Sequence, residues 1–283
     1  MPNVSSSSTL STSARDEADT TLSLHLLRVL IACVRVLPDS MVKQVIGGII
    51  RPDILVVMAR HKRDKMRAGA IRLLQAVLTR SEEEEQNFIK QSGMLLLANQ
   101  LQPYAATASI VEACVSLCVG VDVILEQVLD PFSIWPENPT PLQLQSTILL
   151  LSLLPNAALD PALFHQLATL VRTLATRSNH ILKFLLDVGL VETMGKSIVA
   201  LAHAAKNCPG DILEQREDEI LLEAIHRILI LIATRTVSAS GICLLLSYVI
   251  SVFKILIYYT MFRNSTMDGF SRYDPAVPLH GTC

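Results

Sequence analysis

The sequence predicts an all-α protein, built as an armadillo- or HEAT-like helical solenoid. Hydrophobic residues make up 51% of it and aromatic residues only 5%, a balance that favours helices over short strands. Apolar residues recur three and four positions apart, as the buried face of a helix requires. A pattern marked by glycine also recurs at a spacing typical of helical repeats.

Three regions are expected along the chain. Residues 1–20 are rich in Ser and Thr and have almost nothing to bury, so we expect a disordered segment there. Residues 21–236 carry the helical patterns and should form the solenoid. Its first helix is predicted over 22–37, where Pro38-Asp39-Ser40 ends it and caps the next helix. Residues 237–283 should form a hydrophobic helix and an irregular tail.

The repeat consists of a short helix, a glycine, a very apolar helix, a turn and an amphipathic helix. It is marked by Gly48, Gly93 and Gly189, so its copies are 45 and then 96 residues apart, the second interval being close to two periods. Armadillo and HEAT units are roughly 40 to 47 residues long. We expect each glycine to adopt a left-handed conformation that lets one helix turn sharply into the next. The chain should hold about five such repeats.

Prolines interrupt the array between the second and third copies. Four of them lie in residues 131–141 and exclude a helix there, so we expect an ordered loop pinned by Trp135. Asp160-Pro161 is typical of a helix start, with Asp as the cap and Pro in the first turn. A last regular helix is predicted from Asp211 to Thr234.

Three stretches resemble a known family. LRVLIACVRVLPDSMVKQVI, RAGAIRLLQAVLTRSEEEEQNFIKQSGMLLLANQL and LLDVGLVETMGKSIVAL follow one another in this order. They resemble the helical region upstream of the BEACH domain in BEACH-family proteins of the lysosomal trafficking type, most tellingly in Leu97 to Leu101. The resemblance covers residues 25–240, whereas BEACH, PH-like and WD40 parts are absent from the sequence. It implies a fragment or short isoform of a very large cytosolic scaffold that regulates lysosome size and traffic.

Charge and cysteine usage exclude some functions. The formal net charge is -2, so the chain lacks the basic surface that nucleic-acid binding needs. Its six cysteines are far apart except for Cys114 and Cys118, which favours a reducing compartment over a disulfide framework. The expected location is therefore the cytoplasm.

No catalytic or metal-binding motif is found. Cys114 and Cys118 share one helix face, as a zinc half-site would, but no further ligand lies at the usual spacing, and we interpret them as small buried side chains. Six histidines stand singly on predicted helices (His25, His61, His165, His180, His203 and His226). We therefore expect no catalytic residue, no cofactor and no metal, and a protein that is not an enzyme.

Two charged runs have structural explanations. Residues 60–67 (RHKRDKMR) are interpreted as a solvated loop between repeats, with contact to acidic lipid headgroups as the alternative. Glu82 to Glu85 follow Ser81, and Ser81 with Glu84 should form a capping box at a helix start.

The tail leaves three alternatives open. From Gly241 to Phe262, 17 of 22 residues are apolar or Tyr, which is long enough to cross a bilayer. Lys254 opposes this reading because a charge in the bilayer is costly. The stretch could equally be one more buried helix, or belong to an unselected tail supplied by an alternative exon.

The sequence therefore predicts a non-enzymatic scaffold that binds other proteins through the solenoid surface. The alternative is a single-pass or tail-anchored membrane protein that contacts the membrane through residues 241–262. The binding residues stay unassigned, because exposed positions of a solenoid cannot be told apart in a single sequence.

Overall fold

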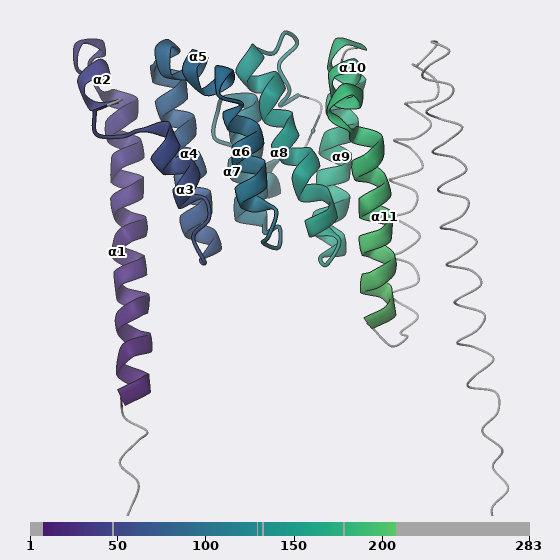
Figure 1. Ribbon diagram of the computed structural model, residues 1–283, viewed down its shortest axis with the longest axis horizontal. Helices are drawn as coiled ribbons and strands as arrows, with labels where there is room; N and C mark the ends of the chain where they lie inside the picture. Colours follow the sequence, from purple (N-terminus) through teal and green to yellow (C-terminus); the bar gives the residue numbers. More distant parts are fainter. Residues whose placement is uncertain (1–7, 47, 129, 132, 178, 208–283) are drawn as a thin grey trace, which may run out of the picture. The chain divides into compact units, whose positions relative to one another are not determined.

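The computed structural model describes residues 8–46, 48–128, 130–131, 133–177 and 179–207 (Figure 1). The chain divides into two compact units, Met1–Leu231 and Ile232–Cys283, and all described residues belong to the first. The predicted helix from Asp211 to Thr234 and the apolar stretch 241–262 lie outside the described residues. Among the helices that are described, none is both long and apolar enough to cross a bilayer.

The described ranges are helical, as predicted, and contain no strand. One isolated bridge pairs Ile46 with Ile50. The helices are α1 (Ser8–Val36), α2 (Asp39–Val45), α3 (Pro52–Met58), α4 (Asp64–Arg80), α5 (Glu82–Lys90), α6 (Gly93–Leu101), α7 (Ala108–Val119), the short 3-10 helix η1 (Leu125–Gln127), α8 (Pro141–Ala157), α9 (Pro161–Arg177), α10 (Asn179–Val188) and α11 (Leu190–Asn207).

The helices pack in two rows. In one row α1 packs on α4 and α4 on α7, and in the other α3 packs on α6, α6 on α8 and α8 on α11 (Figure 1). The rows meet where α3 packs on α4, α7 on α8 and α8 on α9. Each helix therefore touches neighbours that follow it closely in the chain, and the apolar core is continuous from one pair of helices to the next.

Helix α4 shows why these sequences form a row. Its side chains from Ala68 to Leu78 are buried at nearly every position, and Ile71, Leu74 and Val77 have no exposed surface. A helix that is buried around most of its circumference must have partners on more than one side. Here α1, α3 and α7 supply them.

The N-terminal helix is longer than the sequence predicted. Residues 8–20 were expected to be disordered with the rest of 1–20, but α1 begins at Ser8, and residues 1–7 lie outside the described part. No Gly or Pro interrupts the chain between Ser8 and Val36. Extending an existing helix costs far less than nucleating one, so the apolar half of α1, anchored on α4, carries the polar half with it.

The three signature glycines have different roles. Gly189 has a φ of 105° and confirms the predicted left-handed turn. At the second signature the left-handed residue is Ser92 (φ 54°), and Gly93 is needed for space, because a Cβ there would lie 2.5 Å from the Phe88 ring. Gly48 has no positive φ. The prediction of a left-handed glycine was thus wrong at Gly48 and Gly93.

The predicted loop and helix starts are mostly confirmed. Trp135 is 2% exposed, and its Nε1–H donates to Thr173 Oγ1 at 3.1 Å, which pins the proline-rich loop to α9. Asp160 caps α9 by accepting from the Leu163 N–H at 3.1 Å. Ser81 accepts from the Glu84 N–H at 3.4 Å, which is the first half of the expected capping box. At α2 the cap position is Pro38, without a side-chain cap bond.

Candidate functional site

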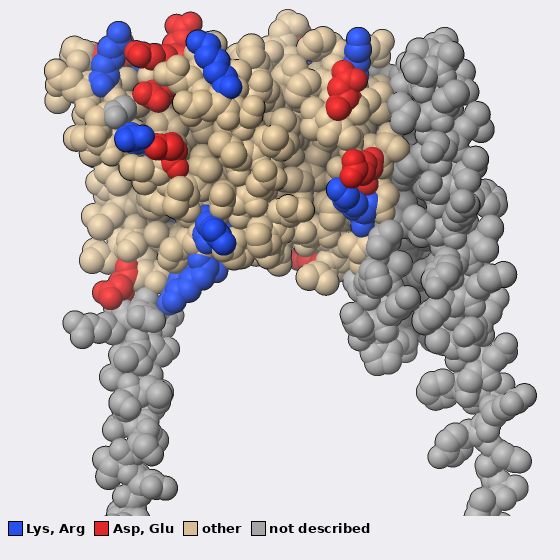
Figure 2. Space-filling view, viewed as in Figure 1, with Lys and Arg blue, Asp and Glu red and all other residues tan. Residues whose placement is uncertain are grey.

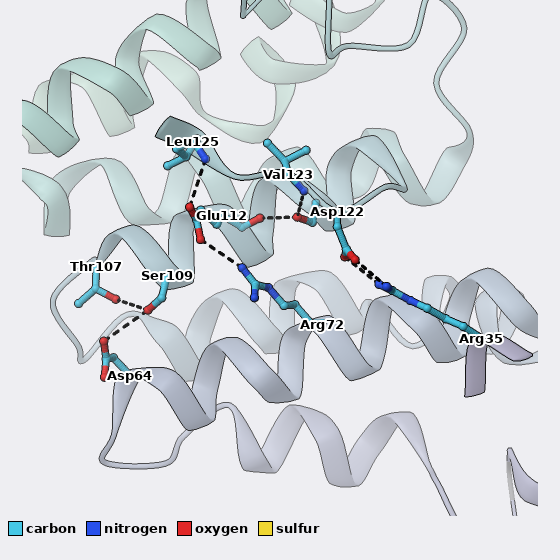
Figure 3. A network of polar contacts seen from close by, with 10 residues as sticks. Arg35, Asp64, Arg72, Thr107, Ser109, Glu112, Asp122, Val123 and Leu125 are labelled. Atoms are coloured by element: carbon cyan, nitrogen blue, oxygen red, sulfur yellow. Dashed lines mark hydrogen bonds and ion pairs between the residues drawn. The ribbon is translucent and has the colours of Figure 1, made fainter. Parts of the chain in front are cut away.

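A ladder of ion pairs joins α1, α4 and α7 (Figure 3). Arg35 on α1 donates from both terminal nitrogens to Asp122, at 2.5 and 2.7 Å. Arg72 on α4 donates to Glu112 on α7 at 3.1 Å. The hydrogen bonds with Arg35 lower the pKa of Asp122, and the same bonds raise the pKa of Arg35. Both groups are therefore charged at neutral pH.

The acids of this ladder also hold the loop that follows α7. The second carboxylate oxygen of Glu112 accepts from the Leu125 N–H at 3.1 Å. Ser116, which is fully buried, donates to the Glu112 carbonyl at 2.7 Å and accepts from the Val123 N–H at 2.9 Å. The ladder therefore fixes the loop against the row of helices. Its charged and polar side chains form hydrogen bonds with one another and with the backbone of the loop.

A second chain of contacts ties two loops and the end of a helix together. Tyr104 donates its hydroxyl to the Arg60 carbonyl at 2.7 Å. Asn156, near the end of α8, donates its amide to the carbonyls of Gln102 and Tyr104 at 2.8 and 2.9 Å. The loops around residues 60 and 104 and the end of α8 therefore lie side by side and form one edge of the described unit, which we call the loop edge.

Arg67 completes the loop edge from inside. It is 4% exposed and stacks 4.3 Å from the centre of the Tyr104 ring. Its guanidinium donates to the carbonyls of His61 and Lys62 at 2.8 and 3.1 Å. Burial lowers the pKa of Arg67, and Asp64 opposes this by attraction. Although Arg67 belongs to the predicted basic run, it is thus buried and stabilises the turn, and its charge is not presented at the surface.

The other basic residues of the run are split between two environments. Arg60, Lys62 and Lys65 are exposed, whereas His61 and Arg63 are half-buried. His61 Nδ1 accepts from the Arg63 N–H at 3.1 Å, which closes the turn.

The acidic run lies at a helix start, as predicted: Glu82 to Glu85 form the first turn of α5. Burial, and secondarily Glu82, raise the pKa of Glu85.

The cysteine pair lies in the core. Cys114 is fully buried and Cys118 is 2% exposed. Burial raises the pKa of Cys118 to about 12 and that of Cys114 well above its ordinary value. Since the thiolate is the reactive and metal-binding form, both thiols are inert at neutral pH. No group of three His, Cys, Asp or Glu side chains within the described ranges is placed to hold a metal ion.

Helix α1 carries an apolar seam that has no partner in the described unit. Its five members alternate four and three residues apart. Four of them are 56% to 80% exposed (Leu22 60%, Leu26 56%, Val29 57% and Val36 80%), and the fifth, Cys33, is also exposed. We call this set the α1 seam. Leu27 and Val34, on the opposite face of the helix, are buried on the side that packs against α4.

The spacing of the α1 seam is that of a helix–helix contact. Steps of four and three place the five residues in a narrow line along one side of the helix, as the core positions of a coiled coil require. Histidine and arginine residues border the line on one side, at His25 and Arg28. The seam was not predicted from the sequence, although its signal was present: apolar residues on two opposite faces of one helix predict two packing surfaces.

Charge is sparse at the centre of the face in Figure 2, where Lys, Arg, Asp and Glu gather toward the borders around a broad uncharged area. Exposed aliphatic side chains also occur on α6, where Leu95 and Leu96 are 51% and 50% exposed. Of the histidines that the structure describes, His25, His165 and His180 are exposed on three different helices, α1, α9 and α10.

The chain has a distant relative among named proteins. It is 28% identical to the human lysosomal-trafficking regulator over 207 residues, which cover 73% of this chain and 5% of that protein. No family model matches the chain, and no solved structure does. The sequence, which spans one short part of the regulator's length, is thus distantly related to a lysosomal-trafficking regulator.

Proposed function

We propose that this chain is an armadillo-like segment of a cytoplasmic protein-interaction scaffold that acts in lysosome and vesicle traffic, without catalysis. The armadillo assignment is supported by the two rows of helices and by the repeated packing of α1 on α4 and α4 on α7. The role in trafficking is supported by the similarity to the lysosomal-trafficking regulator. The BEACH-family assignment rests on the sequence resemblance.

The α1 seam is the observation that carries the scaffold proposal. Exposed aliphatic side chains in a 4-3 spacing lower solubility unless another helix covers them. The proposed occupant is an amphipathic helix of a protein partner. Acidic side chains at the border of that helix would face His25 and Arg28, and would favour this occupant over a basic one.

Lysosome size in cultured cells tests the proposal. Expression of the full chain should change the mean lysosome diameter, measured by microscopy of a lysosomal membrane marker, because a free segment competes with the intact scaffold for its partner. The double variant Leu26→Glu/Val29→Glu should lose this effect. The matched control is Leu95→Glu/Leu96→Glu on α6, which adds the same charge at side chains of similar exposure.

The outcomes separate the two parts of the proposal. If the unaltered chain leaves lysosome diameter unchanged at levels above the endogenous regulator, the trafficking role is contradicted. If both double variants act as the unaltered chain does, the scaffold does not use the α1 seam. Circular dichroism of each variant must show the same helix content and melting temperature, since neither pair contributes to the core.

A further inference from the structure

The turn between α3 and α4 is the most basic feature of the described surface. Residues 60–67 contain five Lys or Arg and one acid, Asp64. Arg60, Lys62 and Lys65 point to solvent, and none of them takes part in an ion pair among the described residues. Asp64 is half-buried and accepts from the Ser109 hydroxyl at 3.3 Å, so part of its charge is used within the fold.

The backbone of this turn is held from inside. Tyr104 binds the carbonyl of Arg60, and Arg67 binds those of His61 and Lys62. Three successive carbonyl groups are thus directed into the protein. The side chains of Arg60 and Lys62 remain outside, and a turn with a fixed backbone presents their charges together without the entropy cost of ordering a loop.

Apolar side chains stand beside these charges. Val57, at the end of α3, is 68% exposed, and Ile54, one turn earlier, is 49% exposed. Basic residues next to exposed aliphatic groups are what a protein needs to rest on an anionic membrane, where the charges meet lipid headgroups and the aliphatic groups enter the interface. A protein partner or nucleic acid would need a more extended or more basic surface than this turn offers.

We propose that the α3–α4 turn, with Arg60, Lys62, Lys65 and Val57, is a docking site for the surface of a membrane that contains anionic phospholipids. The site shares no residue with the α1 seam. The proposal does not depend on the trafficking role. Each basic residue near an anionic surface strengthens binding about fivefold, so the three together contribute on the order of a hundredfold.

Vesicle co-sedimentation of the full chain tests the charges. Binding to vesicles of phosphatidylcholine with phosphatidylserine is compared with binding to phosphatidylcholine alone. Arg60→Glu/Lys62→Glu/Lys65→Glu should lower the preference for anionic vesicles at least about a hundredfold. Lys43→Glu/Lys90→Glu/Lys183→Glu, at three exposed positions elsewhere, changes the net charge equally and should lower it much less. If both triple variants lost the preference for anionic vesicles equally, the preference would depend only on net charge, and the proposal would be overturned.

Tryptophan fluorescence tests the contact itself. The chain has a single Trp, which is buried in the proline-rich loop. Val57→Trp adds a reporter at the turn, and Val121→Trp adds one at a comparably exposed position after α7. On anionic vesicles the emission of the first variant should shift to the blue, and that of the second should not. No shift at position 57, or displacement by soluble glycerophosphoserine at constant ionic strength, would contradict docking to a membrane surface.

Discussion

Helices α1 and α4 belong to the same row, but their apolar faces are covered by neighbouring helices to different extents. Both carry apolar residues on two opposite faces. In α4 both faces are covered, by α1 and α7, whereas α1 is covered on one side and leaves the α1 seam exposed. The difference shows that an interface can be recognised in a single chain when one member of a row has the residues of an interior helix without its neighbours.

A buried leucine of α4 and an exposed leucine of α1 should differ most in their effect on stability. Leu74→Ala in α4 removes a fully buried side chain and should lower the free energy of unfolding by about 2–5 kcal/mol. Leu26→Ala in the α1 seam should change it by less than about 0.5 kcal/mol. Urea denaturation followed by circular dichroism measures both. A cost at Leu26 as large as that at Leu74 would mean that the seam is already covered.

Thiol labelling compares the same two regions without changing the stability. Cys33 lies on the α1 seam and is exposed, whereas Cys114 and Cys118 are buried on α7. Iodoacetamide should modify Cys33 at least about a hundredfold faster, because the buried thiols react only after local opening and hold their protons. Peptide mass spectrometry gives each rate separately. In concentrated urea the three rates should converge, and similar rates in buffer would contradict the packing of α7.

Two arginines that bridge neighbouring elements should also differ. Arg67→Ala leaves two turn carbonyls without their charged donor and removes the stack on Tyr104, and should cost about 2 kcal/mol of unfolding free energy. Arg35→Ala breaks a pair whose side chains are 41% and 52% exposed, and should cost less than about 1 kcal/mol. Thermal melts of both variants rank them. A larger loss of stability in Arg35→Ala than in Arg67→Ala would show that the ion pair on α1 stabilises the fold more than the contacts of Arg67 in the loop edge.

The smallest effect concerns pH. The pKa of Asp122 is lowered in the folded state, so its contribution to stability is present above its ordinary value near 3.8 and is lost as the pH falls through the lowered pKa. Asp122→Asn should therefore be less stable than the unaltered chain at neutral pH, by less than about 1 kcal/mol, and equally stable in strong acid. Arg35→Gln should show the same convergence, and the double variant should add nothing to either single one.

Much of the helical pattern could be predicted from local signals. The spacing of apolar residues gave the helices, Asp160-Pro161 marked the start of α9, and Trp135 was correctly expected to pin its loop. These signals succeed because each depends on residues within one or two turns of the chain. The prediction of disorder for residues 8–20 failed for a related reason. Composition predicts disorder there, but a polar segment that is joined to a packed helix continues that helix.

The surfaces could not be predicted, because they depend on residues far apart in sequence. Asp122 is 87 residues from Arg35, and Tyr104 is 44 residues from Arg60. Whether two such side chains meet is decided by the length and rotation of the helices between them. Ser92 illustrates the same limit at short range: it adopts the left-handed conformation, while the Phe88 ring lies against Gly93, and residue preferences had favoured the glycine for that conformation.

The loop edge has a mechanical consequence. Tyr104 and Asn156 join the segments near residues 60, 104 and 156 by hydrogen bonds, and Arg67 stacks on Tyr104, so these segments cannot move apart without breaking these contacts. A force that bends the row of helices must then spread the opposite ends of α4, α7 and α8. Bending would have a preferred direction, and a scaffold built from such segments would be stiff when pulled along one edge and compliant along the other.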